Sequence, residues 1–142
     1  MKAQTNNHAS APGRIRTLIA DDSAAFQKAI RQFLECLPQI EVVGIAEDGV
    51  QAVTLVASTR PDLVLMDMQM PRLNGLHATR RIRTKFPSVQ VIITTLHDSC
   101  ELKAASLAAG AKRFIPKQCL GEELTIAIEQ LFPGKEKVNG GI

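Results

Sequence analysis

The chain has 142 residues, of which 45% are hydrophobic and 22% charged, and this fits one soluble globular domain with its own core. Its net charge is +3, but four of the 17 basic and one of the 14 acidic residues lie outside residues 15–133, so the segment between is neutral. A neutral body argues against a nucleic-acid-binding domain, and no apolar stretch is long enough for a membrane span.

The predicted elements begin after a polar segment, residues 1–14, which we expect to be a disordered leader. An apolar run at 15–20 predicts the first strand. A helix is expected from about Ser23, because apolar residues then recur every three or four positions until Pro38. Ser23 is also a suitable N-cap for this helix.

The middle of the chain repeats this alternation of strand and helix. A second strand is predicted at 41–46, and the next helix is expected between Asp48-Gly49 and Pro61. A third strand at 63–66 is apolar throughout, as expected of a strand that is covered on both faces of a sheet.

The second half begins with a loop and turn that Met70-Pro71 and Asn74-Gly75 mark. After it, apolar runs of strand length again alternate with helical periodicity. The predicted elements are a helix from Leu76 to Phe86, a strand at 90–94, a helix at 99–109, a strand at 112–115 and a helix that ends at Pro133. Residues 134–142 are expected to form a flexible tail.

Five strands that alternate with five helices predict an α/β domain over residues 15–133, with right-handed crossovers and a parallel sheet. The spacing of the elements is too small for an eight-stranded barrel. The carboxyl ends of parallel strands meet at one edge of an open sheet, and ligands bind at that edge. Side chains that follow the strands are therefore the candidates for a functional site.

Three carboxylates follow two of the predicted strands. Asp21 and Asp22 come directly after the first strand, and Asp67 comes directly after the third. Buried carboxylates are costly unless something pairs with them. A divalent cation would relieve the repulsion among them, and Mg²⁺ prefers oxygen ligands and binds phosphate oxygens as well. The arrangement predicts a metal-assisted phosphoryl site.

An aspartate can attack phosphorus as a nucleophile and form an acyl phosphate. Asp67 is the candidate nucleophile, because it stands alone at the end of the central strand, and Asp21 and Asp22 are the candidate metal pair. Thr95, after the fourth strand, can donate its hydroxyl to a phosphoryl oxygen, and Lys117, after the fifth, supplies a cation.

These residues and the motifs around them resemble the receiver domain of two-component response regulators. The resemblance extends from about Arg16 to Phe132 and rests on an ordered set: Asp21-Asp22, Asp67 in the run Met66-Asp67-Met68-Gln69-Met70-Pro71, Asn74-Gly75, Thr95, Phe114 and Lys117. The stretch 91–98 and the Gly110-Ala111 turn are most similar to receivers of the NarL/FixJ type.

The resemblance implies a flavodoxin-like, doubly wound sheet of five parallel strands in the order 2-1-3-4-5. It also implies that Asp67 takes a phosphoryl group, with Mg²⁺, from a histidine kinase or a histidine phosphotransfer protein. Such a receiver catalyses only its own phosphorylation and dephosphorylation and is not a turnover enzyme. In the metal site, Asp22, Asp67 and the backbone carbonyl of Gln69 would bind Mg²⁺ directly, and Asp21 would act through water.

The resemblance further implies a switch. Thr95 and Lys117 would hold the phosphoryl oxygens, and Phe114 would turn inward when Thr95 moves. The output face would be formed by 99–109, 112–115 and the final helix. A downstream protein target or output domain would dock there, and the same face would serve a homodimer. We expect neither nucleic acid nor membrane to bind the chain itself.

Three positions depart from the family pattern. Thr94 sits beside Thr95 and is the alternative switch hydroxyl, although Thr94 fits a strand position that is usually aliphatic. Leu96 is bulkier than the small residue of many receivers and is expected to narrow the access to Asp67. Proline precedes Lys117 instead of following it, which argues against a cis peptide bond after that lysine.

The cysteines indicate a reducing compartment. Cys36, Cys100 and Cys119 are odd in number, far apart and without a CxxC motif, which argues against a disulfide scaffold or a zinc site. The polar N-terminus also lacks the apolar run of a signal peptide. We therefore expect a cytoplasmic protein.

Other functions fit parts of the pattern. A haloacid-dehalogenase-type phosphatase also uses an aspartate nucleophile after a strand, but it needs a second acid two residues later, where this chain has Gln69. A dinucleotide site would need a glycine-rich loop after the first strand. A DNA-binding regulator would need a DNA-binding domain after the receiver, and residues 134–142 are too few for a helix-turn-helix. The remaining alternative to a stand-alone receiver is therefore a receiver fragment of a longer DNA-binding regulator.

Overall fold

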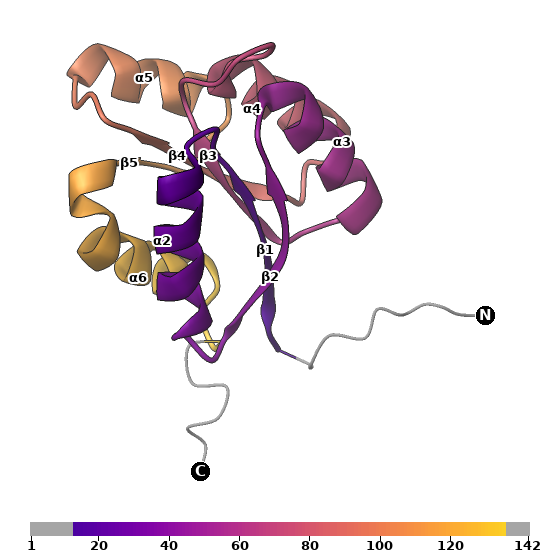
Figure 1. Cartoon of the computed structure of the whole chain (residues 1–142), viewed down its shortest axis with the longest axis vertical. Helices are drawn as coiled ribbons and strands as arrows, with labels where there is room; N and C mark the ends of the chain where they lie inside the picture. Colours follow the sequence, from indigo (N-terminus) through magenta and orange to yellow (C-terminus); the bar gives the residue numbers. More distant parts are fainter. Residues whose placement is uncertain (1–12, 136–142) are drawn as a thin grey trace.

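The structure is a computed structural model that describes residues 13–135 (Figure 1). Five strands alternate with five α-helices, and a short 3₁₀ turn precedes the last helix. The elements are β1 (Ile15–Ala20), α2 (Ala24–Glu35), β2 (Ile40–Ala46), α3 (Gly49–Thr59), β3 (Leu63–Asp67), α4 (Gly75–Lys85), β4 (Gln90–Thr95), α5 (Cys100–Ala108), β5 (Arg113–Pro116), η1 (Lys117–Cys119) and α6 (Leu120–Leu131). The predicted alternation of strands and helices is confirmed.

The ends of the elements differ from the prediction by a few residues. Strand β4 includes Thr95, and β5 lies one residue later than expected because Pro116 pairs with Thr95. Most of the expected leader (1–14) and tail (134–142) lies outside the described residues. None of the helices in residues 13–135 has the length and hydropathy of a transmembrane span.

The sheet is parallel and has the strand order β2-β1-β3-β4-β5. The predicted doubly wound, flavodoxin-like arrangement is therefore confirmed. The register aligns the carboxyl ends of the inner strands: Ala20 pairs with Met66, and Asp67 pairs with Thr94. The residues that end or follow these strands lie at one edge of the sheet as a result.

Helices cover both faces of the sheet, as Figure 1 shows, with α2 and α6 on one side and α3 and α4 on the other. Each face has its own apolar core, because side chains alternate along the strands. The α2–α6 side is built on Ile19, Leu65, Ile92, Leu34 and Ile128. The α3–α4 side, to which α5 also contributes, is built on Leu18, Met66, Ile93, Val56 and Ile82.

Four helices, α2, α3, α4 and α5, begin at the carboxyl edge of the sheet, and each begins with an N-cap side chain. An N-cap side chain accepts a hydrogen bond from the backbone N–H three residues later, which satisfies a donor that the helix leaves free. The caps and their donor–acceptor distances are Ser23 (3.2 Å), Asp48 (2.7 Å), Asn74 (3.0 Å) and Ser99 (3.0 Å). These caps fix the loops that follow β1, β2, β3 and β4.

Candidate functional site

Three aspartates meet at the carboxyl edge of the sheet. Asp21 and Asp22 follow β1 and Asp67 ends β3, and one carboxylate oxygen from each lies within 4.8 Å of the others. Asp21 is 1% exposed and Asp67 is 5% exposed, while Asp22 is open to solvent. The structure thus brings together the three acids that strand ends alone had suggested.

Lys117 follows β5, an outer strand of the sheet, and its side chain reaches this acidic cluster (Asp21, Asp22 and Asp67). Its Nζ lies 2.8 Å from Oδ2 of Asp21 and 3.6 Å from Oδ1 of Asp67. The Lys117 side chain is only 10% exposed, so these ion pairs are shielded from water. The ammonium balances part of the charge that the two buried carboxylates bring to the site.

Backbone donors hold the two buried carboxylates in place. Oδ1 of Asp21 accepts a hydrogen bond from the Ser23 N–H at 2.8 Å, and the Asp21 carbonyl accepts one from the Gln27 side chain. Oδ1 of Asp67 accepts a longer bond, 3.4 Å, from the Gln69 N–H. Gln69, the expected carbonyl ligand, therefore lies beside Asp67 in the loop that follows β3.

Burial raises the pKa of Asp67 from 3.8 to about 6, and the neighbouring charge of Asp21 adds to the rise. The Lys117 ammonium and the Gln69 N–H lower this pKa but do not cancel the effect of burial. The surroundings of Asp67 thus disfavour its negative charge. A bound cation, or a covalent modification of the carboxylate, would relieve this unfavourable burial of charge.

A pH dependence of stability follows from the raised pKa of Asp67. Between the unfolded pKa of 3.8 and the folded pKa of about 6, the folded state binds more protons than the unfolded state. The stability contributed by this group is therefore present below pH about 4 and is lost as the pH rises through about 6. Asp67→Asn should be more stable than the wild type by about 1–2 kcal/mol at pH 8, after allowing for solvent screening.

Urea unfolding at pH 4 and pH 8, without divalent cations, measures this effect on the free energy of unfolding. The advantage of Asp67→Asn should be large at pH 8 and small at pH 4. An equal advantage at both pH values would contradict the assigned cause.

The two expected switch residues lie on neighbouring strands. Thr95 ends β4, is buried, and accepts a hydrogen bond at Oγ1 from the His97 N–H at 3.1 Å. Thr94 is the register partner of Asp67, while Thr95 follows the opposite alternation of the strand. Phe114 is already buried in the core on the α3–α4 side. The described residues have no cis peptide bond, including the one after Lys117.

Two contacts at the site were not expected from the sequence in this form. The ring of Phe26, in the first turn of α2, lies with its centroid 4.1 Å from Nζ of Lys117. At Gly75, a Cβ atom would come within 2.2 Å of the Asp67 carbonyl oxygen, so the chain after Asp67 passes directly against α4. The motif Asn74-Gly75 predicted a turn, but the close approach of Gly75 to the Asp67 carbonyl is visible only in the folded structure.

The donor set fits a hard divalent cation. Three carboxylates offer oxygen ligands at one place, one of them open to solvent, and oxygen is what Mg²⁺ binds while it keeps several waters. The same place has a buried ammonium within reach of Asp67. The edge can therefore receive both a metal ion and an anionic group attached to Asp67.

Comparison with curated proteins identifies relatives that are longer than this chain. A protein-glutamate methylesterase/protein-glutamine glutaminase from Pyrococcus abyssi is 41% identical over 73% of this chain and 28% of its own length. The transcriptional regulatory protein DegU from Brevibacillus brevis is 34% identical over 85% of this chain and 51% of its own length. The chain thus spans about half or less of these relatives.

Solved structures match nearly the whole described fold. The signal receiver domain of the response regulator NarL from Mycobacterium tuberculosis has a TM-score of 0.80 and 27% identity, and the match covers 87% of this chain and 99% of that domain. A chain of the CheX-CheY-BeF3-Mg+2 complex from Borrelia burgdorferi has a TM-score of 0.78 and 25% identity, with 83% and 89% of the two chains covered.

The family model described as response regulator receiver domain matches residues 17–129. That range contains the three aspartates of the acidic cluster, Lys117 and four complete strands of the sheet. The resemblance that the motifs had suggested is confirmed. The chain belongs to the family of response regulator receiver domains.

Proposed function

We propose that this chain accepts a phosphoryl group on Asp67 from the phosphohistidine of a histidine kinase or a histidine phosphotransfer protein. The observation that carries the proposal is the placement of Asp67: it is buried, it faces the Lys117 ammonium, and two further carboxylates adjoin it. The receiver unit would be residues 15–133, with a leader before it and a tail after it.

In the transfer, a carboxylate oxygen of Asp67 attacks phosphorus. A P–O bond forms as the P–N bond to the donor imidazole breaks, and the imidazole keeps the electron pair and takes up a proton. The attacking group must be ionised, so the raised pKa of Asp67 favours transfer above pH about 6. Lys117 would pair with the oxygens that carry negative charge in the transition state, and Thr95 would donate its hydroxyl to one of them.

Asp22, Asp67 and the backbone carbonyl of Gln69 would hold Mg²⁺ directly, with Asp21 acting through water. When bound, Mg²⁺ neutralises phosphoryl charge that a cluster of carboxylates would otherwise repel. The related complex from Borrelia burgdorferi contains BeF3 and Mg+2, which supports the proposal that the site of this chain binds Mg²⁺ together with a phosphoryl group.

Magnesium binding should require Asp22. We expect Asp22→Ala to abolish binding, because it removes the solvent-facing carboxylate of the acidic cluster, while the fold stays intact. Glu47→Gln is the matched control, since Glu47 is an exposed acid at the same sheet edge but outside the cluster. Calorimetric titration with magnesium chloride gives the affinity, and normal binding by Asp22→Ala would refute this ligand set.

The experiment that tests the function is incubation with acetyl phosphate, with and without magnesium. Intact-protein mass should increase by one phosphoryl group only when magnesium is present. A turnover phosphatase would instead release phosphate continuously and show no lasting mass increase. No uptake under either condition would overturn the proposal.

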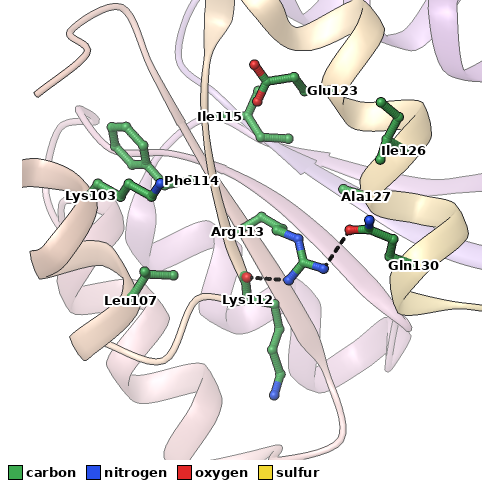
Figure 2. A pocket seen from close by; sticks show the side chains of 10 residues that line it. All are labelled: Lys103, Leu107, Lys112, Arg113, Phe114, Ile115, Glu123, Ile126, Ala127 and Gln130. Carbon is green, nitrogen blue, oxygen red and sulfur yellow. Dashed lines mark hydrogen bonds between the residues drawn. The ribbon is translucent and has the colours of Figure 1, made fainter. Parts of the chain in front are cut away.

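The proposed output is a change on the face formed by α5, β5 and α6. Figure 2 shows a pocket on this face that is lined by both apolar and charged side chains, with the Arg113 side chain in the middle of the view. Leu107 and Ile126 are exposed on it, and Lys103 and Lys112 bring positive charge. Arg113 donates to the Gln130 side chain and so links β5 to α6. A downstream protein, an output domain or a second copy of the chain would dock there.

The switch is expected to depend on Thr95. Phosphorylation would draw the Thr95 hydroxyl from the His97 N–H toward the phosphoryl group, and the side chain of Phe114, which is buried in the core on the α3–α4 side, would turn further inward. One charge-assisted hydrogen bond gives about a 10- to 150-fold shift in the balance of two conformations. With beryllofluoride, NMR shift changes should extend across residues 102–128. They should vanish in Thr95→Ala but persist in Thr94→Ala, and changes confined to the acidic cluster would exclude the switch.

Two further proposals concern the setting of this receiver. A cytoplasmic location fits the three free cysteines, two of which are exposed. A second candidate for the output is that the receiver works inside a longer regulator, and the 51% coverage of a transcriptional regulatory protein favours it.

A further inference from the structure

We infer that Phe26 is a positioning residue, whose aromatic ring holds the Lys117 ammonium at the acidic cluster. The ring centroid lies 4.1 Å from Nζ of Lys117, well within the distance at which a cation is attracted to a ring face. The inference rests on the proposed role of Lys117 in phosphoryl transfer. It adds to that site an apolar residue that carries no charge and no hydrogen-bonding group.

The side chain of Lys117 needs a contact that fixes its position, because it reaches the acidic cluster from β5, the outermost strand of the sheet. It follows β5, whereas Asp67 ends β3 and Asp21 follows β1, and β4 lies between. A lysine side chain is a flexible stem with one compact charge at its end, so many rotamers would carry the ammonium elsewhere. The Phe26 ring comes from α2, on the side of the sheet that α2 and α6 cover.

The ring contact differs from the two ion pairs in one respect that matters for the reaction. Phosphorylation would convert the Asp67 carboxylate, whose Oδ1 is now 3.6 Å from Nζ, into an acyl phosphate, which is a mixed anhydride without the carboxylate charge, and so change that contact. The ring quadrupole stays the same in both states. Because the Lys117 side chain is only 10% exposed, the attraction is stronger than at an open surface. Phe26 can therefore hold the ammonium before and after transfer.

A purely structural role for Phe26 has a matched control on the same helix. Phe26 and Phe33 are both half-buried, both belong to α2, and both pack against the same apolar core. Of these two rings, only that of Phe26 contacts a cation among the described residues. Phe33→Leu thus removes a ring from this helix face, whereas Phe26→Leu removes a ring together with its contact to Lys117.

The test compares the wild type with Phe26→Leu, Phe26→Trp and Phe33→Leu. The first measurement is the rate of phosphorylation by acetyl phosphate with magnesium, followed by intact mass. The second is the NMR position of the Lys117 ε protons, which a ring face shifts upfield. Thermal unfolding of all four proteins records the structural cost of each substitution.

We expect Phe26→Leu to slow phosphorylation by about 3- to 10-fold and to remove the upfield shift. Phe26→Trp should restore both, because its ring also attracts a cation, and Phe33→Leu should change neither. An unchanged rate in Phe26→Leu, no rescue by Phe26→Trp, or an ordinary Lys117 shift in the wild type would each overturn the inference. A wild type that takes up no phosphoryl group would instead overturn the proposed function, whatever the Lys117 shift.

Discussion

Replacing Asp67 with asparagine is expected to abolish phosphoryl uptake from acetyl phosphate. The amide has nearly the shape of the carboxylate but lacks a nucleophilic oxygen anion, so no acyl phosphate can form. The fold should survive, because the substitution removes a buried charge whose pKa is raised to about 6. Loss of uptake together with undiminished stability at pH 8 would separate chemistry from folding.

Asp98→Asn is the matched control for this loss. Asp98 is an exposed aspartate in the loop after β4, at the same edge of the sheet, and it lies outside the acidic cluster. We expect this variant to take up one phosphoryl group at nearly the wild-type rate. Labelling of Asp67→Asn to the wild-type extent would show that another residue is the acceptor.

Gly75→Ala should destabilise the domain by about 2–4 kcal/mol. A Cβ atom at position 75 would lie 2.2 Å from the Asp67 carbonyl oxygen and 2.8 Å from Cα of Met68, and both are backbone atoms that cannot rotate away. The Gly75 N–H also donates to the Met68 carbonyl at 2.8 Å, so the loop cannot shift without losing this bond. Urea unfolding measures the loss.

Gly121→Ala provides the opposite expectation in the same chain. Gly121 is exposed in α6, and a Cβ atom there would meet nothing within 4 Å. Alanine should therefore stabilise the domain by about 0.5–1 kcal/mol through its higher helix propensity. For Gly75→Ala, an unchanged free energy of unfolding would contradict the close contact between position 75 and the backbone after Asp67.

The order of the elements could be predicted because local signals in this chain agree with one another. Ser23, Asp48, Asn74 and Ser99 each precede a stretch of helical periodicity, and each caps a helix in the structure. The shift in β5 has a physical reason. Pro116 has no N–H, which argues against a strand position, but β5 is an edge strand, where proline is tolerated.

The acids of the site could be predicted because each one directly follows a strand or ends it. The contacts of Lys117 could not, since its rotamer decides that Nζ lies closer to Asp21 than to Asp67. The sequence shows Phe26 only as an apolar residue on a helix face. Its contact with a cation depends on how α2 packs against the end of β5. The raised pKa of Asp67 likewise depends on burial, which the sequence does not quantify.

The most direct test of the account is to locate the phosphoryl group itself. After phosphorylation with acetyl phosphate and magnesium, borohydride reduction converts an aspartyl phosphate into homoserine, and peptide mass spectrometry finds the altered residue. The account predicts homoserine at position 67 and at no other aspartate. Homoserine elsewhere, or a phosphoryl group that borohydride does not remove, would contradict the assignment of Asp67 as the phosphoacceptor.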